Sequence, residues 1–449
     1  GNRWIYKRKI RYMINKISRI DYPLFFLFGT VINFSSRTVA QAQENLFSTE
    51  NITRIVCLSV AFILISFYMI KTRAIERLHI SIPIFCLFLF WLEGILSFVF
   101  CEWMSYGLLK WIEYFVILLG ACYISCLDRK IPGYALRSYE MMKIFLEVLI
   151  ASVMIGALID PERALYRGEN EYSALRDAVL PFILRGWIIS ITSTSVGMIS
   201  AILLFDRIIK ILDEGAHFND VVKLCVFSGC VITAQSRTAI IGLSIALVFL
   251  VICSRMSKKI KIFFVAFGIT ILLIFSQDLF SFLLRGQEGE VLASFSGRTV
   301  WWEYAWNFFK QSNGYIKLFG NGFAAGEKII AARSNAVMYT LDSEYFAILI
   351  SNGLFGLFCY GLFWIKTFQK IRIKIKQDRR ENKKFGLGIE VLGVSIIILC
   401  RTFTVTSLAL HTYYLLIMVF LLCAIDGKAK SFQRRNFNEY WKTRCRASK

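Results

Sequence analysis

Charged residues in the long stretch 285–342 are the strongest candidates for chemistry in this sequence. The stretch separates the apolar segments 262–284 and 344–368, and it carries Arg298 in its interior and Asp342 at its end. A guanidinium group can bind a phosphate through two parallel hydrogen bonds, and a carboxylate can accept a proton from a sugar hydroxyl. These residues predict a site that holds an anion and activates a hydroxyl, although Asp342 also suits a simple helix cap.

Three further charged residues lie where apolar segments begin or end. Arg237 follows Gln235 and Ser236 in a tight turn between two apolar segments, Glu344 opens the segment 344–368, and Arg401 lies near the end of another segment. A cation at such a depth needs an anionic partner unless its side chain reaches the surface. Arg237 is therefore a candidate anion ligand or an interface anchor, and Glu344 and Arg401 are candidate substrate contacts.

The segment 299–309 repeats its apolar residues at helical spacing, and we expect an amphipathic helix that lies in the membrane interface and begins beside Arg298. An arginine next to a helix amino terminus makes a favourable phosphate site. The aromatic residues of this region are either stacking surfaces for a substrate ring or interface anchors. The face predicted for the helix holds Trp301, Trp302, Ala305, Trp306 and Phe309, and the other aromatic candidates are Tyr304, Tyr166 and Tyr172.

The composition predicts an all-α, polytopic integral membrane protein. Hydrophobic residues make up 56% of the chain, which includes 40 Phe and only 5 Pro. A soluble core cannot bury that much apolar surface. Windows of about 17 to 25 apolar residues indicate about twelve transmembrane helices. These spans lie near 21–36, 53–70, 79–100, 105–126, 143–159, 187–205, 220–234, 238–254, 262–284, 344–368, 386–405 and 408–425.

The formal net charge of +22 follows the predicted topology and does not indicate nucleic-acid binding. The positive-inside rule places the loops that carry it, and both termini, in the cytoplasm. We expect one membrane domain over 1–449, with large outer loops at 160–186 and 285–342 and a basic inner tail at 426–449. The basic clusters lie at 3–19, 71–77, 129–137, 207–210, 255–261, 370–384 and 428–449.

Cysteine and histidine offer little chemistry. Nearly all of the 12 Cys fall inside predicted spans, so no disulfide framework is expected. Of the 3 His, only His411 lies near the outer half of the membrane. We therefore expect no metal site and no histidine-activated nucleophile.

Three short motifs together resemble a known family. They are Gln235-Ser236-Arg237 at a span junction, Gly297-Arg298 at the start of the loop helix, and a segment at the entry to the next span that begins Asp342-Ser343-Glu344 and ends Asn352-Gly353-Leu354-Phe355-Gly356. The combination is similar to the O-antigen polymerase (Wzy-type) and O-antigen ligase superfamily of bacterial envelope glycosyltransferases. The likeness covers about residues 220 to 368.

The resemblance implies lipopolysaccharide or related polysaccharide biosynthesis at the periplasmic face of the inner membrane, on an oligosaccharide linked to undecaprenyl diphosphate, with no cofactor or metal. Arg237 and Arg298 would hold the diphosphate. The ligases typically carry histidine where this chain has Asp342, and this difference favours a polymerase with Asp342 as the base. A chain-length regulator is a candidate partner besides the membrane lipid.

Other functions stay open at this point. A ligase would transfer the glycan to lipid A-core, whereas a flippase or another transporter would show charged or broken helices near the midplane and internal repeats. A peptidoglycan polymerase would use a similar lipid-linked donor. A non-catalytic scaffold would not need convergent arginine and aspartate residues on one face.

Overall fold

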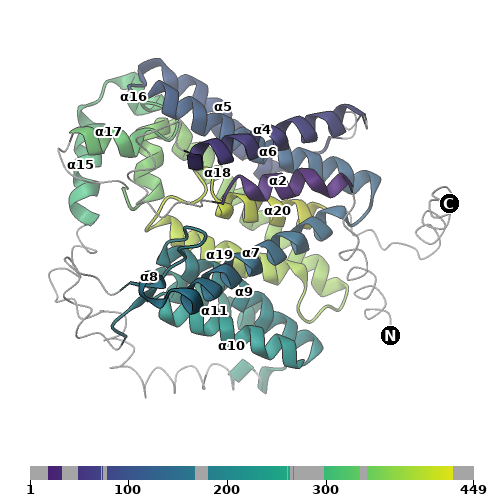
Figure 1. Ribbon diagram of the computed structural model, residues 1–449. Coiled ribbons are helices and arrows are strands. Elements are labelled where there is room, and N and C mark those ends of the chain that lie inside the picture. Colours follow the sequence, from purple (N-terminus) through teal and green to yellow (C-terminus); the bar gives the residue numbers. More distant parts are fainter. Residues whose placement is uncertain are drawn as a thin grey trace.

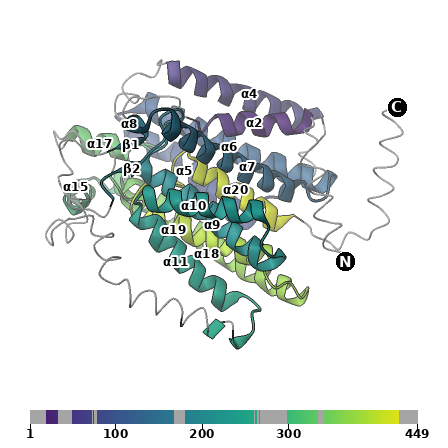
Figure 2. The ribbon, with the colours of Figure 1, turned by 60° about the horizontal axis from the view of Figure 1, so that its bottom comes forward.

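The computed structural model describes residues 19–32, 49–71, 73, 78–166, 180–259, 261–262, 266, 298–333 and 341–427 of the chain. These residues form a bundle of long helices with a group of short helices at one end (Figures 1 and 2). The bundle helices are α2 (Tyr22–Gly29), α4 (Thr49–Lys71), α5 (Ile82–Ser97), α6 (Met104–Lys130), α7 (Tyr134–Ile159), α9 (Ser193–Glu214), α10 (Phe218–Thr233), α11 (Arg237–Cys253), α18 (Glu344–Arg380), α19 (Leu387–Thr402) and α20 (Tyr413–Asp426).

The shorter elements gather at the end of the bundle where α18 begins. The two views agree that α15 and α17 lie at the same end as α8 and its short hairpin (Figures 1 and 2). These elements are α8 (Pro161–Ala164), β1 (Leu165–Tyr166), β2 (Ile183–Leu184), α15 (Arg298–Gln311), α16 (Gly314–Phe319), α17 (Gly326–Arg333) and the 3-10 helix η3 (Phe98–Phe100). The other 3-10 helix, η1 (Arg19–Asp21), lies at the opposite end, beside Tyr123 and Tyr134. The strands β1 and β2 pair antiparallel, with Leu165 opposite Leu184.

The helices have the length and composition of a helical membrane protein. Within the described residues, five are long and apolar enough to cross a bilayer, and α11 and α20 are shorter apolar helices. The number of twelve spans stays a prediction, and the predicted span 262–284 lies almost wholly outside the described residues. The five long segments are Ile52–Lys71, Ile82–Phe100, Met104–Lys130, Tyr134–Ile159 and Glu344–Arg380.

Two of the predicted spans begin later than the apolar pattern suggested. The predicted span 187–205 corresponds to α9, which starts at Ser193, and the predicted span 408–425 corresponds to α20, which starts at Tyr413. The reason is clear for α20, because the Thr412 side chain accepts hydrogen bonds from the first backbone N–H groups of the helix and fixes its start. Hydrophobicity alone did not distinguish the preceding apolar loop from the helix.

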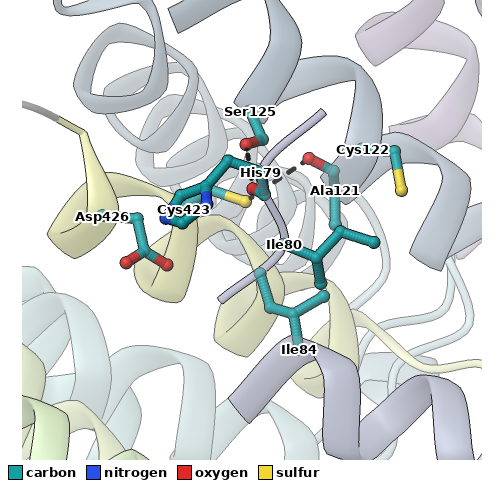
Figure 3. Close-up of a pocket in the computed structure, with 8 residues that line it drawn as sticks. All are labelled: His79, Ile80, Ile84, Ala121, Cys122, Ser125, Cys423 and Asp426. Atoms are coloured by element: carbon teal, nitrogen blue, oxygen red, sulfur yellow. Dashed lines mark hydrogen bonds between the residues drawn. The ribbon is translucent and has the colours of Figure 1, made fainter. Parts of the chain in front are cut away.

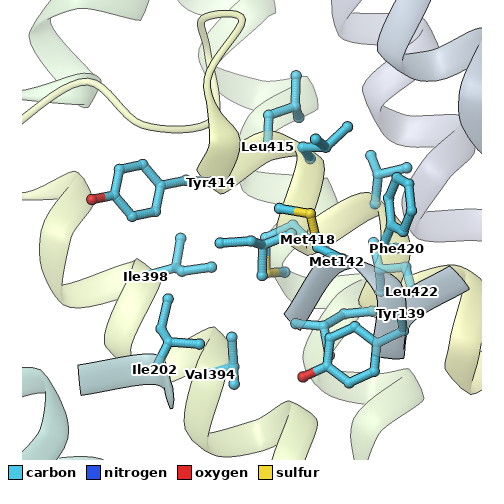
Figure 4. Close-up of a cluster of buried hydrophobic side chains, with 14 of the residues drawn as sticks. Tyr139, Met142, Ile202, Val394, Ile398, Tyr414, Leu415, Met418, Phe420 and Leu422 are labelled. Atoms are coloured by element: carbon cyan, nitrogen blue, oxygen red, sulfur yellow. The ribbon is translucent and has the colours of Figure 1, made fainter. Parts of the chain in front are cut away.

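The core of the bundle surrounds α20. Every residue of α20 from Tyr414 to Ile425 is buried, and a helix that is apolar on all sides is expected at the centre of such a protein. Side chains from α7, α9 and α19 pack against it, including Met142, Ile202 and Val394 (Figure 4). This packing fixes the loop that connects α19 to α20 at the end of the bundle where the short helices lie.

Helix α18 is broken at Gly353, whose φ of 64° lies in the left-handed region. The segment between α16 and α17 docks against the break: the Asn321 backbone N–H donates to the Ile350 carbonyl at 3.0 Å, and the Gly326 N–H donates to Ser351 Oγ at 2.9 Å. Gly320 approaches so closely that a Cβ there would lie 2.2 Å from the Ser351 carbonyl oxygen. The glycine turn around Asn321 therefore attaches the segment between α16 and α17 to α18.

The orientation of the bundle gives the first testable prediction. In a Cys-depleted background, thiols introduced by Gly289→Cys and Asn313→Cys should react with an impermeant reagent in intact spheroplasts, because the positive-inside rule places the stretch 285–342 outside. Lys376→Cys and Gln433→Cys serve as the matched inner positions and should react only after permeabilisation. Labelling of the second pair in intact cells, without the first, would invert the predicted topology.

Candidate functional site

Arg298 and Asp342 form an ion pair at the end of the bundle. Arg298 is the first residue of α15, and its Nε lies 3.0 Å from Oδ2 of Asp342, two residues before α18 begins. Both side chains are partly exposed, so a substrate can reach them. Asp342 has a φ of 47°, a backbone conformation that non-glycine residues rarely adopt and that clusters at functional sites.

Arg237 lies beside this pair, at the first position of α11. The turn before it is held by Gln235, whose side-chain amide donates to the carbonyls of Leu180 and Phe182 at 2.9 and 2.7 Å. Ser236 caps the helix by accepting a hydrogen bond from the Ala239 N–H at 3.3 Å. The guanidinium groups of Arg237 and Arg298 lie within electrostatic range of each other.

Arg401 is buried near the start of α11. Its side chain is 5% exposed, its Nη2 lies 3.4 Å from Ser195 Oγ, and its guanidinium group lies over the Tyr414 ring at 4.3 Å. Its Nε has no hydrogen-bond partner among the described residues. The same end of α19 is tied to α11 by a hydrogen bond between the hydroxyls of Thr404 and Thr238. Arg401 therefore retains hydrogen-bonding capacity for an anion, and its contact with substrate stays a prediction.

Glu344 and Trp302 hold the surroundings of Asp342 in place. The Glu344 carboxylate is fully buried and accepts hydrogen bonds from the backbone N–H groups of Leu408 and Ala409 in the loop between α19 and α20. The Trp302 indole donates to the Leu341 carbonyl at 3.1 Å, directly before Asp342. These contacts indicate positioning roles for both residues, and the substrate contacts expected from the sequence stay predictions.

The aromatic face of α15 differs in part from the expected one. Trp301 and Phe309 pack around the buried Ala305 as predicted, but Phe308 joins them and Trp306 is 43% exposed. Among the described residues, α15 packs against α16, α17 and the start of α18, and Trp306 lies on the part of its surface that these helices leave exposed. The exposed group also includes Tyr304, which is 50% exposed and available for contact with a sugar.

Glu327 is a site residue that the sequence did not reveal. It lies in α17, where Thr406 Oγ1 donates to its Oε1 at 2.7 Å. Burial raises the pKa of Glu327 from 4.5 to about 7, and the negative charge of Asp342 contributes to the rise. The two carboxylates are therefore close neighbours, although no motif in the sequence connects them.

The raised pKa of Glu327 predicts a pH-dependent stability. The neutral carboxyl is favoured in the folded protein, so its contribution to stability is full below about pH 4.5 and is lost as the pH rises through about 7. Glu327→Gln is permanently neutral and can still accept the Thr406 hydrogen bond. We expect its melting temperature to exceed that of the wild type at pH 8 and the difference to shrink toward pH 5. Glu162→Gln, on exposed α8, is the control, and a pH-independent difference for Glu327→Gln would contradict the buried carboxyl.

Comparison with known proteins identifies the segment that carries most of these residues. Residues 223–361 match the family model described as O-antigen ligase. The match confirms the resemblance to the O-antigen polymerase and ligase superfamily, whose members are glycosyltransferase-like enzymes that act on lipid-linked polysaccharides. No curated protein matches the chain at a significant level.

The O-antigen ligase match spans most of α10, all of α11, the α15–α17 group and the first half of α18. It therefore includes Arg237, Arg298, Asp342 and Glu344, together with Glu327. Arg401 lies outside it and is brought to the site by the packing of α19 against α11. Tyr166 also lies outside it, with Arg185 stacked over its ring at 4.8 Å, and Tyr172 is outside the described residues.

A second polar network lies at the same end of the bundle, outside the O-antigen ligase match. Arg54 and Lys110 both contact Oε2 of Glu113, each at 2.9 Å, and Arg54 also lies 2.8 Å from Nδ1 of His411. Glu327 connects this network to the ion pair, because its charge acts on Tyr106 in the same helix as Lys110. Sequence analysis missed the network because its members come from three helices and a loop that are distant in the chain.

A small apolar pocket lies at the other end of α6 and is separate from the site. It is lined by Cys122 and Ser125 of α6, by Cys423 and Asp426 of α20, and by His79 (Figure 3). The Ser125 hydroxyl donates to the His79 carbonyl. Within the described residues, no group of three or more histidine, cysteine or acidic residues could hold a metal ion.

Proposed function

We propose that this protein of the O-antigen ligase family is a polysaccharide polymerase of the periplasmic face of the bacterial inner membrane. It transfers a glycan chain from undecaprenyl diphosphate to a sugar hydroxyl of another lipid-linked repeat unit. The observation that best supports this proposal is the Arg298–Asp342 pair at 3.0 Å, with Arg237 beside it. A carboxylate and two guanidinium groups supply the base and the anion ligands that such a transfer requires.

The proposed reaction is a displacement at the anomeric carbon of the donor. The acceptor hydroxyl oxygen attacks this carbon, the bond from the carbon to the diphosphate oxygen breaks, and the hydroxyl proton passes to the Asp342 carboxylate. Undecaprenyl diphosphate leaves with the electron pair of the broken bond. Arg298 and Arg237 neutralise the developing charge from fixed positions, so the diphosphate leaves without the help of a metal ion.

In the proposed reaction, Arg298 releases Asp342 and binds the donor diphosphate instead. Arg298 and Asp342 neutralise each other in the structure described here. A diphosphate offers Arg298 two acceptor oxygens, which match the planar guanidinium group better than one carboxylate oxygen does. Binding of the donor therefore frees the Asp342 carboxylate at the moment when a base is needed. Tyr304, exposed on α15, supplies a surface on which a sugar ring can stack.

A ligase is the second candidate, because the matching family model is described as O-antigen ligase. A ligase needs one lipid diphosphate and a lipid A-core acceptor, whereas a polymerase acts on two lipid-linked units. The histidine that the ligases typically carry at the position of Asp342 is replaced here by a carboxylate. This replacement favours the polymerase.

The product formed from purified components tests the proposal. Purified protein in nanodiscs is supplied with lipid-linked repeat units alone, and the products are resolved by gel electrophoresis. A ladder of lipid-linked oligomers is the expected result. If glycan is transferred only after a lipopolysaccharide core is added, the protein is a ligase. A glycan carried across the bilayer without a new glycosidic bond would instead indicate a flippase.

A further inference from the structure

The network around Glu113 has the composition of a second anion site. Two cations, Arg54 and Lys110, share a single oxygen of Glu113, so one carboxylate faces two positive charges. The Arg54 Nε is buried without a hydrogen-bond partner among the described residues. The remaining ammonium hydrogens of Lys110 also leave donors for a ligand. Buried cations in excess of their counter-charge favour the binding of an anion.

His411 fixes the direction in which Arg54 points. Arginine only donates hydrogen bonds, so Nδ1 of His411 must accept from Arg54, and the ring proton lies on Nε2. Nε2 then donates to the Thr30 hydroxyl at 3.0 Å, and this hydroxyl donates to the Leu27 carbonyl at 2.7 Å. His411 is therefore a neutral positioning residue whose acceptor nitrogen is already occupied.

The network adjoins α17, because Lys110 lies 5.6 Å from the centre of the Tyr106 ring, which Lys328 of α17 also approaches. The charge of Asp342 acts on Glu327, and the charge of Glu327 acts in turn on Tyr106. Lys328, next to Glu327 in α17, lies 4.5 Å from the centre of the Tyr106 ring. Glu327 therefore lies within electrostatic range of both Asp342 and Tyr106, the residue that also contacts the network around Glu113.

We propose that Arg54 and Lys110 bind the diphosphate of the acceptor lipid. The inference rests on the proposed polymerase function, in which two lipid-linked units meet at one base. The donor diphosphate must lie at the reacting bond, beside Arg298 and Asp342. The acceptor diphosphate lies at the far end of its repeat unit from the attacking hydroxyl, and Arg54 and Lys110 form a cationic site separate from Arg298 and Arg237.

The first test counts bound lipids and does not depend on catalysis. Native mass spectrometry of the full-length protein with undecaprenyl diphosphate should detect two bound molecules on the wild type. The double variant Arg54→Gln/Lys110→Gln should bind one molecule, at an unchanged number of detergent or phospholipid adducts. Two molecules bound to a folded double variant, or one bound to the wild type, would contradict a second diphosphate site at Arg54 and Lys110.

The second test separates the two substrates by kinetics. A donor of defined chain length and a single-unit acceptor carry different fluorescent lipids, and transfer is measured in nanodiscs of phosphatidylcholine. Lys110→Gln should raise the KM for the acceptor at least about tenfold, as expected for a lost charge-assisted contact, while the KM for the donor stays unchanged. An unchanged acceptor KM, or a raised donor KM, would contradict the assignment.

Two further measurements distinguish the acceptor site from a purely structural network and from a site for a membrane lipid. Glu113→Gln increases the excess positive charge, so it should lower the acceptor KM. If the network is merely structural, the variant should instead lose thermal stability with no change in either KM.

Addition of phosphatidylglycerol tests whether a lipid headgroup occupies the same site. If Lys110→Gln changes binding of phosphatidylglycerol but not of the acceptor, the site binds the membrane lipid. If the wild type binds two undecaprenyl diphosphates yet forms no ladder, the polymerase proposal is wrong, but the second diphosphate site at Arg54 and Lys110 is confirmed.

Discussion

Replacement of Arg298 by alanine is expected to lower the turnover of the purified protein by about two to three orders of magnitude, as for the loss of one preorganised donor at a developing anion. The same change at Arg237 should act in the same direction, because both guanidinium groups face the proposed leaving group. Lysine should restore activity only in part at either position, since an ammonium group cannot form two parallel hydrogen bonds with a phosphate. The measurement is the initial rate of ladder formation at matched protein levels.

A control variant for the arginine experiment lies at the same end of the bundle. Arg163 of α8 has a side chain that is 68% exposed, pairs with Asp160 three residues earlier and lies over the Trp187 ring. Arg163→Ala should therefore leave the rate within about twofold of the wild type, as is usual for an exposed ion pair. Wild-type rates for both Arg298→Ala and Arg237→Ala would falsify the diphosphate-binding role.

Asp342→Asn is expected to abolish elongation without unfolding the protein. Asparagine has nearly the same size as aspartate and tolerates the left-handed conformation that residue 342 adopts, so the local backbone needs no adjustment. The substitution removes the proton acceptor and keeps a hydrogen-bond acceptor for Arg298. The ladder from lipid-linked units should disappear, while the melting temperature and the binding of undecaprenyl diphosphate persist.

Asp160→Asn is the matched control for Asp342→Asn. Asp160 caps the short helix α8 at the same end of the bundle and lies next to Arg163. Its amide variant should give the full ladder. A full ladder from Asp342→Asn would exclude Asp342 as the base, and Glu327 would then be the first carboxylate to test because it lies beside Asp342.

The sequence predicted the parts of the site that depend on local pattern. Gly297 and Arg298 before an amphipathic run predicted the start of α15, and the Gln235-Ser236-Arg237 turn predicted the start of α11. The order of the motifs also suggested that Arg298 and Asp342 act together, although only packing shows their contact. Helix starts and turns are set by neighbouring residues, which explains why these features were readable.

The remaining features depend on contacts between distant segments. Glu327 and Thr406 meet because α17 packs near the loop between α19 and α20, and no spacing in the chain encodes that contact. The same holds for Arg54 and His411. The 43% exposure of Trp306 was also not predictable, because helical periodicity cannot tell how much of a helix face a neighbour covers.

The break in α18 at Gly353 lies eleven residues after Asp342 and separates the start of the helix from its longer second part. The predicted span 344–368, at about 1.5 Å per residue, would extend roughly 38 Å, somewhat more than a hydrocarbon layer of about 30 Å, and the basic remainder of α18 follows it. The bend at Gly353 shortens the vertical reach, and Asn321 occupies the carbonyl of Ile350 that the bend releases, so the break needs no water from the lipid side. A sugar chain anchored by a lipid tail can present its hydroxyl only within a narrow range of heights. In the proposed reaction, the bend at Gly353 helps to place the Asp342 carboxylate at the height of the acceptor hydroxyl.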